Sequence, residues 1–423
     1  MQRSAGMMGA VGLAAGLSIG LSIGFSYMTT GADDPAAPEQ LTASTGPSGT
    51  IDIGLVLPAT GDVSWHGYDN GLAAQLALED FNRYLDKIDA GWEFNLVVED
   101  SQSDPVVALE KIQSLNSKGI KLVLGTETSA ELRNVRNYAE SNGMLLISPS
   151  SSSSALSIDD RIFRLVPDDT QQGRVTASLL ESRGITAAIP VYRGDVWGDG
   201  LYKTTKGSFE SRGGTLDEGI RYSPESAVFS TEAHLLNERL GEYLQERPAS
   251  EVAIVMMGFE EAVHFFNAAS PYDGLSSVLW TGTDALTNNG LLVEDPIATA
   301  FMEEVGFVSA QFAASQNDRY EHVKKELTSQ IGSSPNSFAY SSYDSLWLLG
   351  MSILQVQSAD PELISVALPT VARHHSGSLG PIILNDAGDL AASDYELYTV
   401  RGGEWVAYGM YKADTEKINS GTL

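Results

Sequence analysis

Residues 51–82 read IDIGLVLPATGDVSWHGYDNGLAAQLALEDFN, and this stretch decides the fold. The apolar run at 51–60 predicts a buried strand, which Pro58 and Gly61 bring to an end. Residues 71–88 carry apolar side chains at helical spacing and therefore predict an amphipathic helix. The stretch thus predicts a strand, a loop over residues 61–70 and a helix.

The same alternation continues outward from this unit. Strands that alternate with helices predict parallel sheets covered by helices on both faces, which is an α/β fold. A second, similar series begins near Asp168, and a mixed C-terminal part follows it. The predicted strands span residues 94–104, 120–129, 144–151, 186–193, 219–223, 251–257, 277–282, 380–389 and 395–406, and the predicted helices span 105–119, 131–143, 171–184, 199–214, 232–247, 260–270 and 338–355.

Composition and charge exclude several classes of function. The chain has 423 residues, enough for two domains, and 26 Lys+Arg against 55 Asp+Glu give a formal net charge of −29. Such a chain repels phosphate backbones, so we expect no nucleic-acid partner. Cysteine is absent and the six histidines are scattered, so we expect no disulfide, no metal centre and no cofactor.

The N-terminus carries an export signal or a membrane anchor. Arg3 precedes a charge-free run over residues 4–30 whose core is long enough to span a bilayer. Gly12, Gly16, Gly20 and Gly24 have the spacing that lets membrane helices pack closely. A cleaved signal peptide is the alternative. In both cases residues 1–32 place the rest of the chain at the extracellular face of the membrane or in the periplasm, after a polar linker at 33–49.

Catalytic motifs are missing from the sequence. It contains no phosphate-binding loop, no GxGxxG opening a helix and no GxSxG elbow; the nearest match, SGSLG at 376–380, lacks the first glycine. We therefore expect a binding protein that is not an enzyme. Its strand-to-helix loops are the place for a ligand, because helix N-termini present free N–H groups that suit a carboxylate. Three of these loops are rich in hydroxyls, including the serine run at 148–155.

Several segments in order resemble the type 1 periplasmic binding proteins, in particular the branch that binds branched-chain amino acids for ABC importers. They are the opening stretch at 51–82, FRLVPDDTQQGRVTASLL (163–180), VYRGDVWGDGLYKTTKGSFESRGG (191–214), FAYSSYDSLWLL (338–349) and GPIILNDAGDLAASDYELYTV (380–400). The resemblance implies two Rossmann-like lobes with parallel sheets, joined by a three-stranded hinge. The implied division is 50–168 plus 311–391 for lobe 1, 169–310 plus 392–413 for lobe 2, and a tail at 414–423.

The resemblance also implies a ligand site in the cleft between the lobes. Ser129, Ser150 and Ser152 fall where the family holds the α-carboxylate of the ligand, and Asp284 falls where an acid pairs with the α-ammonium. The aromatic wall of the pocket falls on His66, Trp197 and Phe259. His66 and Trp197 stand where tyrosine is common in the family, which puts a strictly aliphatic ligand in doubt.

Each of these residues also has a structural alternative. Ser129 and Ser150 can cap the helices that follow them, a role compatible with carboxylate binding. Asp284 can be a cap or turn residue, and Trp197 and Phe259 can be packing residues. The Gly-flanked loop predicts an exposed His66, with Trp65 or Tyr68 as other candidates for the pocket. The remaining serines, Ser151, Ser153 and Ser154, are expected in a solvated turn.

The predicted function is that of an extracellular solute-binding protein. It would capture an amino acid, of the branched-chain type or similar, and deliver it to the permease subunits of an ABC importer. One alternative is a sensor ectodomain of the same fold, and another is a binder of amides or urea, for which an ammonium-pairing Asp284 is unnecessary. Turnover of a bound ligand would be needed to support an enzyme.

Overall fold

A computed structural model describes residues 46–419. The predicted anchor or signal peptide at 1–32 and residues 33–45 of the predicted linker lie outside this range. Within residues 46–419, no helix is both long and apolar enough to cross a membrane.

The first sheet has five parallel strands in the order β2-β1-β3-β4-β5. Because β1 lies between β2 and β3, the chain winds outward from it in both directions, as in doubly wound α/β folds. The strands are β1 (Gly49–Leu57), β2 (Trp92–Asp100), β3 (Leu122–Gly125), β4 (Leu145–Ser148) and β5 (Ile162–Arg164). The helices around this sheet are α1 (Ser64–Lys87), α2 (Pro105–Ser117), α3 (Ser129–Ser141), α11 (Asp318–Ile331), α12 (Ser337–Val356) and α13 (Pro361–His374).

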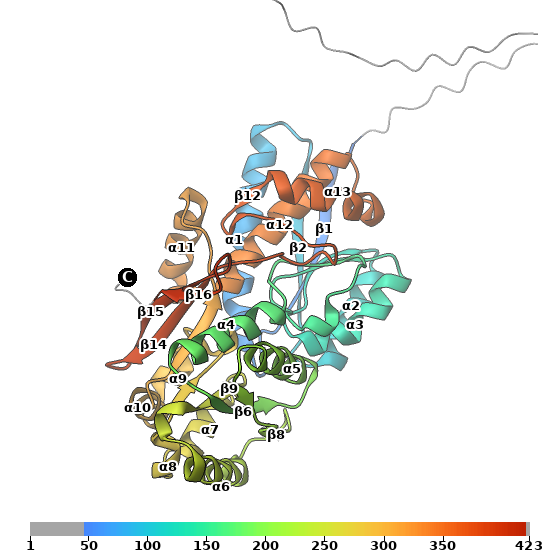
Figure 1. Cartoon of the computed structure of the whole chain (residues 1–423). Coiled ribbons are helices and arrows are strands. Elements are labelled where there is room, and N and C mark those ends of the chain that lie inside the picture. The colour runs from blue at the N-terminus through green and yellow to red at the C-terminus, as the bar shows by residue number, and fades with distance from the viewer. Residues whose placement is uncertain (1–45, 420–423) are drawn as a thin grey trace, which may run out of the picture. The chain divides into compact units, whose positions relative to one another are not determined.

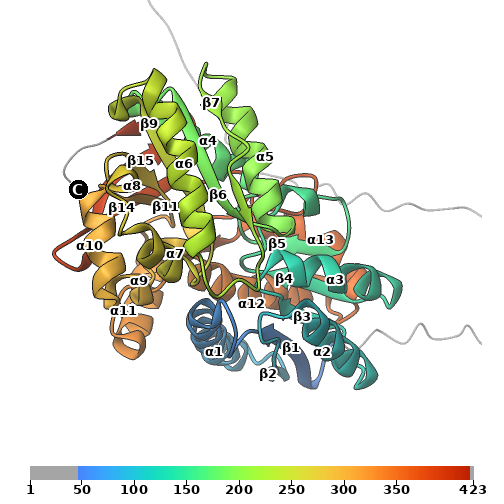
Figure 2. The same cartoon turned by 90° about the horizontal axis from the view of Figure 1, so that it is seen from below.

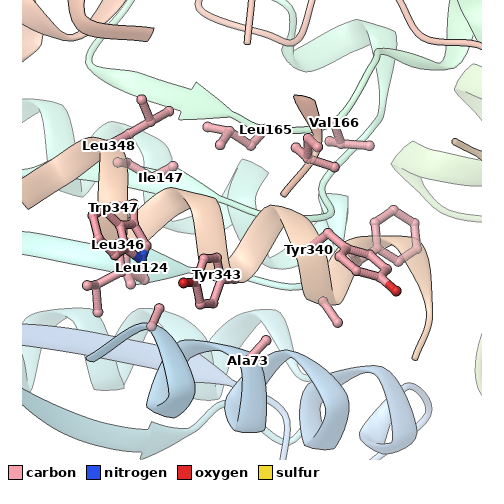
Figure 3. Close-up of a cluster of buried hydrophobic side chains, with 14 of the residues drawn as sticks. Ala73, Leu124, Ile147, Leu165, Val166, Tyr340, Tyr343, Leu346, Trp347 and Leu348 are labelled. Atoms are coloured by element: carbon pink, nitrogen blue, oxygen red, sulfur yellow. The ribbon is translucent and has the colours of Figure 1, made fainter. Parts of the chain in front are cut away.

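Helices cover both faces of this sheet. In β1, Ile53, Leu55 and Leu57 share a core with α1 and α12, whereas Val56 packs with α2 and α3 on the opposite face. This alternation follows from the period of two in a strand, because successive side chains point to opposite faces. Figure 3 shows the first of these cores, in which α12 lies beside α1 and contributes a large share of the side chains.

The second sheet begins with parallel strands and ends in an antiparallel meander. Its order is β16-β15-β14-β11-β10-β9-β6-β7, and β8 also pairs with β6. The strands are β6 (Ala187–Arg193), β7 (Thr215–Leu216), β8 (Ile220–Tyr222), β9 (Val252–Met257), β10 (Leu279–Thr281), β11 (Val308–Phe312), β14 (Tyr395–Arg401), β15 (Glu404–Lys412) and β16 (Lys417–Asn419). Figure 1 shows β14, β15 and β16 together at one edge of this sheet.

Helices also cover both faces of the second sheet. Ala188 and Tyr192 of β6 pack with α5, whereas Ile189 and Val191 of the same strand pack with α6. Figure 2 shows these two helices on opposite sides of β6. The helices are α4 (Asp169–Ser182), α5 (Val196–Glu210), α6 (Ser230–Glu246), α7 (Ala262–Ala269), α8 (Asp273–Ser276), α9 (Gly290–Glu294) and α10 (Pro296–Glu304). The predicted fold class, α/β with two parallel-sheet lobes, is thus confirmed.

Two local predictions were wrong. Helix α1 begins at Ser64, so most of the predicted loop at 61–70 is its first turns. Gly67 permits this, because a Cβ atom there would overlap the carbonyl oxygen of Pro58 at the end of β1. Of the predicted β-segment at 380–389, only Gly380–Pro381 forms a strand, β13, which pairs with β12 (Ser376–Gly377). Farther along, Leu384 and Asp389 form isolated β-bridges.

The lobe boundaries remain a proposal. The boundary at 168/169 coincides with the start of α4, and the one at 310/311 falls inside β11. In the segment proposed as a tail, residues 417–419 form β16 and pair with β15.

Candidate functional site

A small cavity lies between the carboxyl ends of the two sheets. Its volume is about 30 Å³, which is room for about one water molecule. All seven residues predicted for the ligand site line it, so the structure brings them together from positions far apart in the sequence. The lining residues are Val63, His66, Glu127, Thr128, Ser129, Ser150, Ser152, Trp197, Phe259, Asp284, Ala285 and Phe338.

The topology explains why these residues meet. On the first sheet, the lining residues follow β1, β3 and β4, which are adjacent in the sheet. On the second sheet they follow β6, β9 and β10, which are also adjacent. In parallel sheets the carboxyl ends of neighbouring strands share one edge, where ligands bind. Phe338 is the exception, because it comes from the first turn of α12.

The serine loop after β4 is buried and internally hydrogen-bonded. The Ser150 hydroxyl donates to the carbonyl of Glu127 at 2.8 Å, and the Ser129 hydroxyl oxygen accepts from the Ser153 amide at 3.1 Å. The predicted capping roles were wrong: Thr128 caps α3 in a capping box with Glu131, while Ser129 is the first helical residue.

The prediction of a solvated turn for the other serines of the run was also wrong. Ser151 and Ser153 are buried rather than solvated, and Ser154 is half-buried. Ser151 donates to the carbonyl of Thr126 or Glu127, and the Ser153 hydroxyl donates to the carbonyl of Val196 at 3.0 Å. The last bond joins the loop of the first sheet to the start of α5.

A buried ion pair supports the serine loop from behind. Arg164 forms a bidentate pair with Asp389, and both side chains are 1% exposed. The same guanidinium donates to the carbonyls of Ser151 and Ser153, at 2.9 and 2.8 Å. Arg164 therefore binds two backbone carbonyls of the buried loop, and that of Ser153 also accepts from the amide of Leu156 at 3.0 Å.

His66 is buried, contrary to the prediction of an exposed residue. It is 3% exposed and lines the cavity, whereas Tyr68, one of the alternatives to it, is 57% exposed. Burial lowers the pKa of His66 to about 3, so the imidazole is neutral at physiological pH. The reason for the difference is the early start of α1, which turns His66 inward toward Phe338 at a centroid distance of 5.1 Å.

Trp197 and Phe259 form the aromatic wall on the second sheet. Their rings stack with centroids 4.7 Å apart, and the guanidinium of Arg193 lies 4.6 Å from the Phe259 centroid. Asp195 caps α5 by accepting from the amides of Trp197 and Gly198. The two rings are therefore buried packing residues and lining residues of the cavity at once.

Asp284 supplies a buried carboxylate to the second-sheet side of the cavity. It begins a short 3₁₀ helix at 284–286, and one of its oxygens accepts from the amide of Ala285 at 2.9 Å. Burial raises the pKa of Asp284 to about 7. A cation placed beside this carboxylate would restore its ionised form.

Asp169 is a functional candidate that the sequence reasoning missed. It is the first residue of α4 at the crossing from the first sheet to the second, and its amide donates to the carbonyl of Ser152 at 2.8 Å. Both of its carboxylate oxygens are buried without a hydrogen-bond partner. Burial and the neighbouring Asp284 raise the pKa of Asp169 well above its usual value. Two carboxyls thus face one region at the edge of the cavity.

Glu127 and Phe338 were missed as well. Glu127 follows β3 in GTETS, and an acid between a buried strand and a helix start was an available signal for it. Phe338 lies on a helix far along the chain, so only the fold places it at the cavity. The described lining residues include no lysine or arginine, and residues 46–419 contain no group of His, Asp and Glu suited to hold a metal ion.

An ion pair bridges the two sheets beside the cavity. Arg193, at the end of β6, donates to Asp62 after β1 at 2.8 Å, and also to Asp195 and Glu261. The Asp62 carboxylate is 50% exposed, while the guanidinium is 9% exposed. The pair holds the two sets of loops against each other.

Replacing Asp62 by alanine should therefore loosen the contact between the two sets of loops and speed the release of a molecule bound in the cavity. We expect the dissociation rate to rise about two- to fivefold, because half-exposed pairs contribute up to about 1 kcal/mol. Stopped-flow tryptophan fluorescence measures this rate. The matched control is Asp199→Ala, which removes a half-exposed partner of Arg221 within the second sheet and should leave the rate unchanged. An equal effect in both variants would contradict a bridging role.

Comparison with known proteins defines the class to which this fold and site belong. Residues 70–403 match the family described as the receptor family ligand binding region, and the chain belongs to this family. Its fold is that of the type 1 periplasmic binding proteins. The leucine-binding protein LivK of Thermotoga maritima superposes with a TM-score of 0.71 at 19% identity, covering 86% of this chain and 99% of that one.

Curated relatives also match over most of their length, among them two proteins from different organisms. An uncharacterized protein of Methanocaldococcus jannaschii is 25% identical over 397 residues, covering 89% of this chain and 93% of the relative. The Leu/Ile/Val-binding protein BraC3 of Rhizobium johnstonii is 24% identical over 362 residues, covering 84% and 93%.

Proposed function

We propose that this protein is an extracellular solute-binding protein that captures an α-amino acid between its two lobes. The observation that carries the proposal is the lining of one cavity, where serine hydroxyls and the start of α3 lie with Glu127 on the first-sheet side and the buried carboxyl of Asp284 lies on the other. A zwitterion requires donors at one end and an anion at the other, both shielded from water. The names of the relatives, which refer to leucine, isoleucine and valine, support an amino acid as the ligand.

Each residue of the site has a role in this proposal. The hydroxyls of Ser129 and Ser152 and the free amides in the first turn of α3 hold the α-carboxylate, and the Ser150 hydroxyl braces the loop. Asp284, with Asp169 behind it, attracts the α-ammonium. The walls of the pocket are formed by His66, Trp197, Phe259 and Phe338. Capture proceeds by hinge closure and involves no covalent chemistry.

Delivery to an ABC importer is the second part of the proposal. The family resemblance and the predicted export or anchor segment at 1–32 support a location at the extracellular face of the membrane or in the periplasm. The permease subunits of the importer are the expected protein partners. A sensor ectodomain with this fold would bind the same ligand but would not restore uptake to cells that lack the native binding protein.

A binding screen tests the proposal directly. The purified protein is heated with individual α-amino acids, simple amides and urea, and the shift in apparent melting temperature is recorded, because a ligand that binds only the folded state stabilises it. We expect stabilisation by at least one α-amino acid. Stabilisation by uncharged amides or urea alone would overturn the proposal in favour of an amide binder.

Ligand affinity should rise with pH, whereas the stability of the unliganded protein should fall. Asp284 has a pKa of about 7, raised by burial, so below pH 7 the binding of an ammonium requires loss of a proton. We expect affinity to fall between pH 8 and pH 6, by up to about tenfold per unit. Isothermal titration calorimetry measures this fall, and an affinity that stays the same between pH 8 and pH 6 would contradict it.

The unliganded protein should become less stable over pH 6.5–8. The pKa values of Asp284 and Glu127, about 7 and about 8, lie above their usual 3.8 and 4.5, so the folded state holds protons that the unfolded state has lost. The stability that these protons provide is lost as pH rises through the folded-state values. Thermal unfolding without ligand at pH 6.5 and 8 measures the change; a higher melting temperature at pH 8 would contradict it.

A further inference from the structure

One wall of the cavity carries two buried polar atoms without partners. The Glu127 carboxylate accepts from the Asn70 amide through Oε2 at 2.8 Å, but its Oε1 has no hydrogen bond. His66 Nε2 is also buried and unpartnered. The two residues are each 3% exposed, and both line the cavity.

His66 and Glu127 do not form a hydrogen bond with each other. His66 Nδ1 lies 3.7 Å from Glu127 Oε1, which is beyond hydrogen-bonding distance. Buried polar atoms without a partner are rare in folded proteins, because their desolvation is not offset. Both residues line the cavity, so a ligand group bound there can supply the missing hydrogen bonds.

Burial and acidic neighbours keep a proton on Glu127 in the unliganded protein, and a positive group placed beside it would restore the carboxylate. The carboxylate is surrounded by His66 and Asn70 from α1, Ser150 from the serine loop, and the buried carboxyls of Asp69 and Glu131. Among the described neighbours there is no lysine or arginine to balance these acids. An aliphatic side chain would leave both wall atoms unpaired, whereas an –NH₂ or –NH₃⁺ group offers hydrogens to Glu127 and to His66.

Acidic residues also line a larger neighbouring groove. Its volume is about 650 Å³, and it includes Asp62 and Glu260, which are next in sequence to the cavity residues Val63 and Phe259. The other acids along it are Glu225, Glu261, Glu294 and Asp295. Such a groove attracts cations and repels anionic solutes.

We propose that the ligand is an α-amino acid whose side chain carries a hydrogen-bond donor, paired with Glu127 and His66, and that it is not a branched-chain amino acid. This inference rests on the proposed function, because it assumes the zwitterion site at Ser129, Ser152 and Asp284. It assigns Glu127 as the residue that determines specificity for the side chain.

Isosteric pairs of amino acids test the inference by calorimetry on the purified protein. Leucine and asparagine differ in a neutral donor group, and norvaline and 2,4-diaminobutyrate differ in an ammonium group. We expect the polar member of at least one pair to bind at least about tenfold more tightly than its isostere. The pair that shows the larger preference distinguishes an amide from an ammonium side chain.

Variants of Glu127 show whether this residue sets the preference. Glu127→Leu should lower the preference for the polar member by at least about tenfold. Glu110→Gln is the control, because it removes a carboxyl of α2 that is exposed and does not line the cavity. Unfolding of the unliganded variants shows that they fold. If Glu127→Leu does not fold, Glu127→Gln replaces it; because Gln keeps an acceptor but has no charge, it should lower the preference for 2,4-diaminobutyrate over norvaline.

The outcomes separate this inference from the proposed function. Binding of leucine and norvaline as tight as that of their polar isosteres would overturn the inference and leave the proposed function intact. A preference for polar side chains that persists in both Glu127 variants would overturn the role of Glu127. Failure of every α-amino acid to bind would overturn both proposals.

Discussion

Replacing Asp284 by alanine should abolish the thermal stabilisation of this protein by the proposed amino-acid ligand. The carboxylate is buried, and in the proposed complex it is the partner of the α-ammonium. Removing one member of a buried, hydrogen-bonded charge pair costs about 2–5 kcal/mol, which corresponds to a loss of affinity of roughly thirtyfold to several thousandfold. Calorimetry at pH 8, where Asp284 is ionised, measures this loss.

Two further variants make the result specific. Asp386→Ala removes an exposed acid that does not line the cavity and should leave affinity unchanged. Asp169→Asn should weaken binding less than Asp284→Ala does, because Asp169 does not line the cavity. If Asp284→Ala binds the ligand with an affinity within about twofold of wild type, Asp284 is not the partner of the α-ammonium.

Replacing Asp389 by alanine should destabilise the unliganded protein more than any surface substitution. The change leaves the Arg164 guanidinium buried without its anion, and such a loss costs about 3–5 kcal/mol. It also releases the side chain that holds the carbonyls of Ser151 and Ser153, so affinity for the ligand should fall together with stability. Chemical denaturation measures the free energy of unfolding.

An exposed pair provides the comparison for this prediction. Lys118→Ala removes a half-exposed partner of Glu99 and should change stability by less than about 1 kcal/mol. If Asp389→Ala lowers the free energy of unfolding no more than Lys118→Ala does, the buried Arg164–Asp389 pair contributes no more to stability than an exposed pair.

The periodicity of the sequence was sufficient to predict the strands at the centre of each sheet's parallel part and most of the longer helices, but it missed β5, β11 and the helices α10, α11 and α13. Apolar runs such as LVLG and LLIS are buried on both faces, as expected for strands between two layers of helices. The start of α1 was missed because Gly67 weakens the helical pattern in sequence, whereas in the fold it allows the helix to approach β1. The role of such a glycine depends on a neighbour that sequence does not show.

The sequence predicted the residues of the candidate site that lie on strand-to-helix loops. It missed the residues that other elements contribute. The seven predicted residues lie after strands of the two sheets, where the chain order places ligand-binding loops. Asp169 and Phe338 belong to helix starts outside those loops, and nothing in their local sequence points to the cavity. The burial of His66 and Glu127 depends on tertiary packing, which spacing alone does not reveal.

The glycines after His66 and Trp197 have a consequence for how this protein can change its ligand. A Cβ atom at Gly67 or Gly198 would overlap the carbonyl oxygen of Pro58 or Arg193, so each helix is seated against the strand before it. The residue just before each glycine lines the cavity. The positions of the first turns of α1 and α5 are therefore set by the two glycines and not by the side chains before them. Substitutions at residues 66 and 197 can change the shape and polarity of the cavity without moving these helices.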